Sequence, residues 1–247
     1  MKRTILVFSL LAMFCLPYIA YTANLDDFNG NTLNKMWTYR DPKGNGKYVI
    51  KDGKMTFDLK AGADMYVQGT DGGACFLMDP PNLDNFSIEM MVNPSVNGPM
   101  PAACQPGLIF INEAKWAYSI WGPYANTDTR LEDCVGGSYR WRADTKIGID
   151  TNIVAIDKDV YLKITKTGSK LEFFAKGSVG DKWTSGGIDE KLGPNYTKGD
   201  YKVGIAFKSW GGSVNSTFEV DYFDIPEIPK AVDSHGKLAT TWSSIKD

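Results

Sequence analysis

The stretch Gly107 to Gly122, GLIFINEAKWAYSIWG, decides how this chain folds. Two apolar runs flank a polar break at residues 112–114. In the second run the side chains alternate between two faces, formed by Trp116, Tyr118 and Ile120 and by Ala117, Ser119 and Trp121. A period of two is that of a pleated strand. The stretch therefore predicts a β-hairpin, and we expect the face of Trp116 to lie in the core and Trp121 to be exposed.

Short alternating segments separated by turn signals continue on both sides of this hairpin. They occupy residues 48–50, 54–59, 63–68, 74–78, 86–92, 138–142, 160–166, 171–176, 201–207 and 218–225. Asp52-Gly53 and Thr167-Gly168-Ser169 predict tight turns between neighbouring strands. More than ten short strands without a convincing helix predict an all-β sandwich or barrel.

The ends of the chain differ from the rest in composition. Residues 1–23 form a basic head, Lys2-Arg3, an apolar run and a small-residue end, which predicts a secretory signal peptide. The alternative is an N-terminal anchor that is never cleaved. After cleavage we expect no membrane span, and a location outside the cell, in a periplasm or at a cell surface. We expect residues 24–226 to form one β-sandwich domain and residues 227–247 to form a tail. The helical spacing of apolar residues in the tail suits a short helix docked on the domain or on a partner protein, and the alternative is a frayed terminus.

Charge and cysteines exclude some functions. The chain carries 27 basic and 29 acidic residues, and without Lys2 and Arg3 the net charge falls from −2 to −4. An acidic, unclustered surface argues against nucleic acid as a ligand, because phosphate neutralisation needs a basic face. Beyond the leader the cysteines are Cys75, Cys104 and Cys134. Cys104 could pair with Cys134 or with Cys75, or all three could be buried thiols; their spacing gives no zinc signature.

The order of these segments resembles the concanavalin A-like lectin/glucanase superfamily, which includes LamG-type domains and laminarinase-like hydrolases. Four places in the chain account for the resemblance: Asp26-Asp27-Phe28 with Trp37, the stretch from Gly107 to Trp121, the pair 161–164 and 171–174 with Trp183 beyond, and the closing 220–225. The resemblance spans Leu25 to Ile225 and implies a two-sheet antiparallel jelly-roll sandwich. Its pattern specifies the fold well and the function poorly.

The resemblance also implies two kinds of site. A concave outer sheet face with its rim loops is the usual place for carbohydrate. A structural calcium ion is implied near the junction of the first and last strands, where Asp27 and Asp221 would be its carboxylate ligands and main-chain carbonyls could complete the shell. The alternative is that both are solvated acids at strand ends.

A hydrolase of the laminarinase type needs a nucleophile and an acid on one strand. The nearest match is Glu219-Val220-Asp221-Tyr222-Phe223-Asp224, which resembles the family's Glu-x-Asp-x-x-Glu in its bulged form. Two departures weaken the match: the last acid is Asp224 instead of Glu, and the segment is the final strand instead of a mid-chain one. Without a bulge, Asp224 also points away from Glu219.

Non-catalytic carbohydrate binding needs aromatic faces and a few planar polar groups. The candidate binding residues are Trp121, Tyr124, Asn126, Asp128, Arg140, Arg142 and Trp210. We therefore expect a secreted lectin-like domain that binds a polysaccharide or glycan without chemistry of its own. The alternatives are a laminarinase-like glycoside hydrolase acting on a β-glucan-like polysaccharide, and a structural or adhesive extracellular protein.

Overall fold

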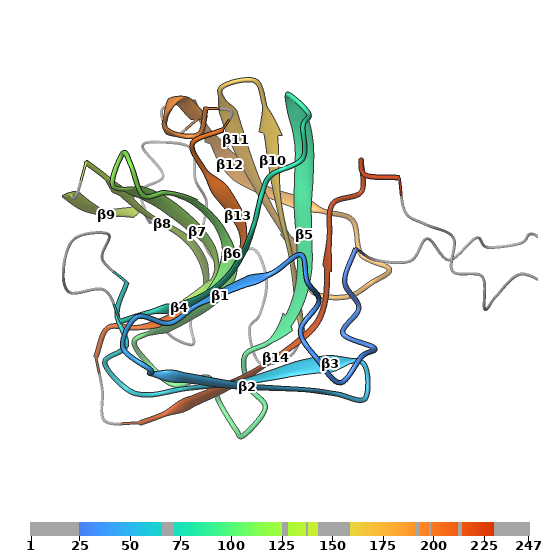
Figure 1. Cartoon of the computed structure of the whole chain (residues 1–247), viewed down its shortest axis with the longest axis vertical. Coiled ribbons are helices and arrows are strands. Elements are labelled where there is room, and N and C mark those ends of the chain that lie inside the picture. The colour runs from blue at the N-terminus through green and yellow to red at the C-terminus, as the bar shows by residue number, and fades with distance from the viewer. Residues whose placement is uncertain are drawn as a thin grey trace, which may run out of the picture.

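The computed structural model describes residues 25–65, 72–124, 128–136, 138–142, 159–190, 193–197, 199–211 and 214–229, with the backbone alone at residues 128 and 138–142. Its strands form two seven-stranded antiparallel sheets that pack face to face (Figure 1). This confirms the predicted two-sheet jelly-roll sandwich. In the described residues the regular structure is all strand apart from one 3-10 turn at Gly193–Asn195. The predicted leader, and the predicted tail beyond residue 229, lie outside the described residues.

The first sheet curves, and we call it the concave sheet. Figure 1 shows β6, β7 and β8 bending so that the face turned away from the other sheet is hollowed. In spatial order its strands are β1 (Thr38–Arg40), β4 (Ala74–Met78), β13 (Lys202–Ser209), β6 (Cys104–Asn112), β7 (Ala117–Tyr124), β8 (Asp128–Val135) and β9 (Ser138–Arg142).

The second sheet covers the inner face of the concave sheet. In spatial order it contains β12 (Thr184–Asp189), β11 (Lys170–Lys176), β10 (Val160–Thr167), β5 (Asn85–Asn93), β14 (Ser216–Asp224), β3 (Lys54–Leu59) and β2 (Gly46–Lys51). The β2–β3 turn has positive φ at Asp52 and Gly53, and Gly168 does the same between β10 and β11. Both predicted tight turns are confirmed.

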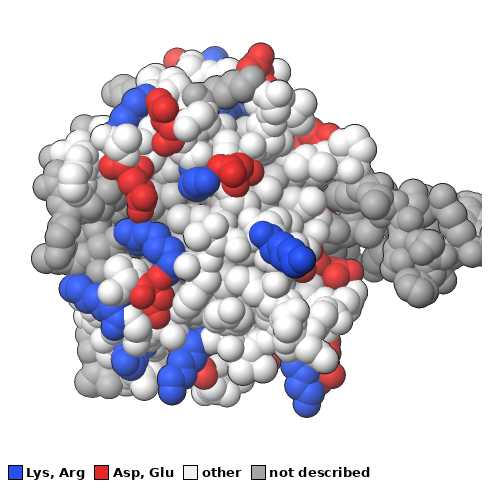
Figure 2. Space-filling view, viewed as in Figure 1, with Lys and Arg blue, Asp and Glu red and all other residues white. Residues whose placement is uncertain are grey.

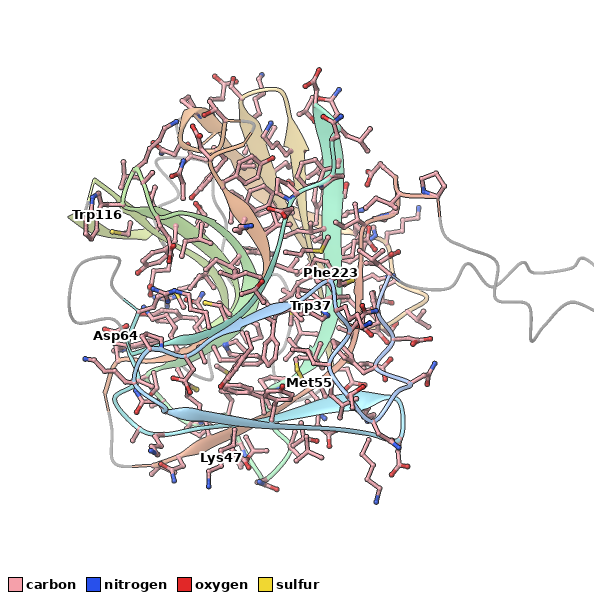
Figure 3. The ribbon with its side chains drawn as sticks, viewed as in Figure 1. Trp37, Lys47, Met55, Asp64, Trp116 and Phe223 are labelled. Atoms are coloured by element: carbon pink, nitrogen blue, oxygen red, sulfur yellow. The ribbon has the colours of Figure 1, made fainter. Side chains whose placement is uncertain are left out.

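The first described residues close the sandwich against its last strand. Asp26 and Phe223 exchange two main-chain hydrogen bonds of 3.0 and 2.8 Å. The Trp37 indole N–H donates to Asp26 Oδ2 at 2.7 Å, and its ring lies 4.9 Å from that of Phe223, edge on (Figure 3). Burial raises the pKa of Asp26 more than the hydrogen bonds from Phe28 N–H and from Trp37 lower it. The two ends of the domain are thus joined in the core.

The hairpin from 107 to 122 forms as β6 and β7, but the face that meets the second sheet is that of Trp121 and not that of Tyr118 and Ile120. Trp121 is fully buried between the sheets, and its indole N–H donates to Phe174 O at 2.8 Å. Tyr118 and Ile120 are buried on the other face, in a separate cluster with Ile109. Trp116 is 42% exposed at the turn (Figure 3). The expectations of an exposed Trp121 and a buried Trp116 are therefore wrong, because both faces of this hairpin are covered and alternation alone does not distinguish them.

Cys75, Cys104 and Cys134 are buried thiols, one of the alternatives for them, and charges of both signs are mixed on the visible surface (Figure 2). Figure 2 shows basic and acidic residues interspersed on the visible face, without a continuous patch of one sign. In the part of the chain that the structure describes, no helix has the length and apolar character needed to cross a membrane.

Candidate functional site

The outer face of the concave sheet collects polar groups from strands far apart in the sequence. Pairing in register places Lys208 of β13 beside Gln105 of β6, and places Glu132 of β8 beside Ile120 of β7. Antiparallel strands bring residues of distant segments to one face at fixed offsets. This face therefore combines charged side chains from β8 and β13 with an apolar centre.

Glycines at the middle of this face let the strands approach closely. A Cβ atom at Gly122 would meet Pro106 O at 2.0 Å, and one at Gly107 would meet Trp121 O at 2.5 Å. On β13, the residue next to Lys208 on the same face is the small Ala206, which is paired with Gly107. The strands β6 and β7 separate Lys208 from Glu132, and at Gly107 and Gly122 they carry no side chain. The long side chain of Lys208 extends above β6 and β7 toward Glu132.

Lys208 is the centre of a buried charge network. Its ammonium contacts Glu132 Oε1 and lies 3.0 Å from Asp64 Oδ1. Lys208 and Glu132 have no exposed surface, and Asp64 keeps a little. Figure 3 shows Asp64 beside the hollowed face. One buried cation therefore holds two carboxylates, an arrangement that offsets the desolvation of the three charges.

Tyr118 completes this network. Its hydroxyl lies 2.9 Å from Met65 O and 3.1 Å from Glu132 Oε1, and since it has a single proton it donates to one of these acceptors at a time. Burial, and next the negative charge of Glu132, raise the pKa of Tyr118 far above its ordinary value. Tyr118 therefore stays a neutral donor. We call Asp64, Tyr118, Glu132 and Lys208 the charge network.

An aromatic stack adjoins the charge network. The rings of Tyr124 and Trp210 are stacked, with centroids 4.5 Å apart, and the guanidinium of Arg130 lies 4.8 Å from the Tyr124 centroid. Lys208 Nζ lies 5.2 Å from the Trp210 ring and so links the stack to the charge network. Trp210 is partly exposed, whereas Tyr124 is nearly covered. Aromatic rings beside charged donors suit the C–H faces and hydroxyls of a sugar.

The predicted binding residues meet different outcomes. Tyr124 and Trp210 come together in the stack, whereas Trp121 is on the opposite face of β7 in the core. Asn126 lies outside the described residues. Asp128, Arg140 and Arg142 belong to β8 and β9, but their side chains lie outside the described part of the chain.

The charge network was not predicted from the sequence. Glu132 gives only an isolated acid when the chain is read linearly, and Lys208 directly follows the predicted strand 201–207. One signal does point to it: a lysine that continues an apolar strand, KVGIAFKS, is unusual unless its charge has a partner. The identity of that partner depends on sheet topology, which a single sequence does not give.

The strand that comes nearest to the laminarinase-like catalytic pattern lies elsewhere. Glu219 and Asp224 are on β14 of the second sheet, and the register shift between Val220 and Tyr222 is the bulge that the family pattern needs. However, Glu219 forms an ion pair with Lys54 at 3.2 Å, and Asp224 Oδ1 accepts hydrogen bonds from the main-chain N–H of Leu25 and Ile225. These acids therefore serve structural contacts on the sheet opposite the hollowed face.

The two carboxylates expected at a calcium site interact electrostatically. Burial is the largest cause of the raised pKa of Asp221, Lys54 lowers that pKa in part, and the charges of Asp159, Asp27 and Glu219 raise it further. Asp27 Oδ2 accepts a hydrogen bond from Asn29 at 2.5 Å. Among the described residues, no group of three or more His, Cys, Asp or Glu side chains could hold a metal ion. Calcium at this place would therefore rely on main-chain oxygens and water, and it stays a prediction.

Comparison with known proteins identifies the fold and no family. No known family matches the sequence, and no curated protein matches it. Among solved structures it is similar to the GH43 protein BlXynB from Bacillus licheniformis (17% identity, TM-score 0.61) and to a xylan β-1,4-xylosidase from Bacillus halodurans (16%, 0.63). The match covers 81% and 83% of this chain but only 38% and 39% of those proteins.

A third structure matches along its whole length. A β-1,3-glucanase from Mycobacterium marinum is 11% identical with a TM-score of 0.52, and the match covers 83% of this chain and 99% of that one. At these identities the likeness shows a shared all-β sandwich. The resemblance to LamG-type domains in particular stays a prediction.

Proposed function

We propose that the protein is a secreted carbohydrate-active protein whose glycan site lies on the outer face of the concave sheet at the partly exposed Trp210, beside the charge network, and that it hydrolyses glycosidic bonds there. The observation that carries this proposal is the contact of Asp64 and Glu132 with the same Lys208 ammonium. A retaining glycosidase needs two carboxyl groups roughly 5 Å apart, and two carboxylates that share one ammonium can meet this spacing. The glycoside hydrolases among the similar structures support the same choice.

In such a mechanism, one carboxylate attacks the anomeric carbon while the other carboxyl group protonates the departing glycosidic oxygen. Water then releases the sugar from the first carboxylate, and the second group takes a proton from that water. Tyr118, a neutral donor 3.1 Å from Glu132, would orient this carboxylate. Trp210 and Tyr124 would hold the neighbouring sugar ring.

A second candidate is glycan binding without hydrolysis, the function expected from the sequence. The complete burial of Glu132 and Lys208 favours it, since a catalytic carboxyl group must reach its substrate. In that case the charge network would stiffen the sheet beneath the binding face, and the stack of Tyr124 and Trp210 would make the contact.

One experiment separates these candidates. The chain from residue 24 onward is incubated with xylan, β-1,3-glucan and xyloglucan, and both retention in affinity gels and release of reducing sugar are measured. If the protein hydrolyses glycans, Glu132→Gln and Asp64→Asn should each lower sugar release at least a hundredfold. Glu219→Gln, on the second sheet, should leave sugar release unchanged. Glycan binding without sugar release supports the second candidate if Trp210→Ala weakens that binding. Neither binding nor release, together with a stable oligomer, would instead support a structural role and contradict both.

A further inference from the structure

A cleft of about 640 Å³ lies at one end of the sandwich. Loop residues 79–84, 193–197 and 199–201 form it together with Lys202 at the start of β13 and the β10–β11 turn, and none of the lining residues belongs to the charge network or to the aromatic stack. Its volume is within the range of small-molecule sites, roughly 300 to 1,000 Å³. The walls include Pro80, Pro81 and Tyr201. The cleft is therefore large enough for a ring-sized ligand.

Lys166 is a buried cation in this cleft. It continues the inward-facing row of β10 after Leu162 and Ile164, and it is only 9% exposed. Its Nζ donates to Gly168 O at 2.7 Å and lies 3.5 Å from Asp84 O. No carboxylate of the described residues lies within ion-pair distance of this Nζ, so its hydrogen-bond partners there are main-chain carbonyls.

The acids that line the cleft have other partners. Asp79 pairs with Lys202, Glu113 with Arg40 at 3.0 Å, and Asp200 accepts a hydrogen bond from Thr197 Oγ1 at 3.1 Å. The remaining acid, Asp84, acts on Lys166 only at longer range: burial lowers the pKa of Lys166, and the charge of Asp84 offsets this in part. A carbonyl oxygen solvates an ammonium without neutralising it, so this cation keeps an open place for an anion.

We propose that this cleft binds a small carboxylate ligand with a ring-sized body, and that Lys166 pairs with its carboxylate group. The apolar walls at Pro80, Pro81 and Tyr201 contact the ring. Both acidic sugars and aromatic acids have this chemistry, and the test distinguishes the two sources. The proposal stands on the cleft and on Lys166, independently of the activity proposed for the concave sheet.

Calorimetric titration with glucuronate, benzoate and glucose tests the proposal. We expect saturable binding of at least one acid and none of neutral glucose. Lys166→Met should weaken the binding at least tenfold, and Lys166→Arg, which keeps the charge, should retain it within about threefold. Lys202→Met is the matched control, because it removes a second ammonium from the same cleft that already has a carboxylate partner. Melting temperatures of all variants establish that each one folds.

A chemical readout complements the titration. The bound acid should slow acylation of Lys166 by an N-hydroxysuccinimide ester, followed by peptide mass spectrometry, and should not slow acylation of Lys202. Binding of benzoate alone would assign the cleft to aromatic acids, and binding of glucuronate alone to acidic sugars. No saturable binding of either acid, or equal binding by wild type and a folded Lys166→Met variant, would overturn the proposal.

Discussion

Lys208 on β13 and Glu132 on β8 form an ion pair in which neither side chain has exposed surface, across the two strands that separate them. Removing one member of a buried pair leaves an uncompensated charge and costs about 3–5 kcal/mol. Lys208→Met leaves both Glu132 and Asp64 without this cation, so we expect a loss of that size in the free energy of unfolding, measured with urea.

The matched control is Lys54→Met, which breaks the solvent-accessible pair with Glu219. Surface pairs contribute about 1 kcal/mol or less. Similar small losses for both lysines would contradict the description of Lys208 as the centre of a buried network.

Substitutions of Trp121 and of Trp210 should have different effects, the first on the stability of the fold and the second on glycan binding. Trp121 fills the core and donates to Phe174 O, so Trp121→Ala should cost about 3–5 kcal/mol of unfolding free energy. Trp210 is partly exposed and stacked on Tyr124, so Trp210→Ala should cost about 1 kcal/mol while weakening glycan binding about tenfold. Urea unfolding and affinity gels measure the two effects. A larger loss of unfolding free energy for Trp210→Ala than for Trp121→Ala would show that the core and the binding face are assigned incorrectly.

The fold could be predicted from the sequence because strand periodicity and turn residues are local. Asp52-Gly53 specifies its hairpin through backbone conformations that few residues adopt, and β10 and β11 alternate over their whole length. The faces of β7 could not be predicted, because each of its eight residues is buried. A period of two assigns residues to two faces, but it does not say which face meets the second sheet.

The charge network could not be predicted for a different reason. Glu132 and Lys208 are 76 residues apart, and they meet because β13 is placed between β4 and β6. That placement is a property of the whole topology. Tyr124 and Trp210 were predicted one by one from their residue type, whereas their contact depends on the same placement of β13.

If calcium binds between the first and last strands, a chelator should lower the melting temperature. Since a ligand that binds only the folded state stabilises it by mass action, the melting temperature in millimolar Ca²⁺ should be several degrees higher than in EDTA. Asp221→Asn should remove most of that difference, because it withdraws one of the two proposed carboxylates. Asp58→Asn, which alters an exposed acid hydrogen-bonded to Thr217, is the control. Equal melting temperatures with and without chelator would end the calcium proposal.

Glu89 should make stability fall as pH rises. Burial is the largest cause of its raised pKa, and the Lys163 ammonium 3.4 Å away offsets part of the effect. The folded state therefore holds the proton more tightly than the unfolded state, so the stabilising contribution is complete below the ordinary pKa of Glu and is lost as pH rises through the raised value. Compared with Glu89→Gln, the wild type should lose unfolding free energy as the pH rises above the ordinary pKa of Glu. Lys163→Met should steepen that loss, and parallel curves for wild type and Glu89→Gln would contradict the assignment.

At Gly122 the strand β7 leaves no room for a side chain beside β6, beneath the charge network. Gly122→Ala places a Cβ atom 2.0 Å from Pro106 O, and because that neighbour is backbone it cannot turn away. We expect a loss of about 3 kcal/mol or more in unfolding free energy, from strain and from separation of β6 and β7. Gly136→Ala is the control: its φ of +60° is strained for alanine but nothing lies within 4 Å, so it should cost about 1 kcal/mol. If Gly122→Ala is no more destabilising than Gly136→Ala in urea, β6 and β7 are not packed as closely as described, and the path of Lys208 above them loses its support.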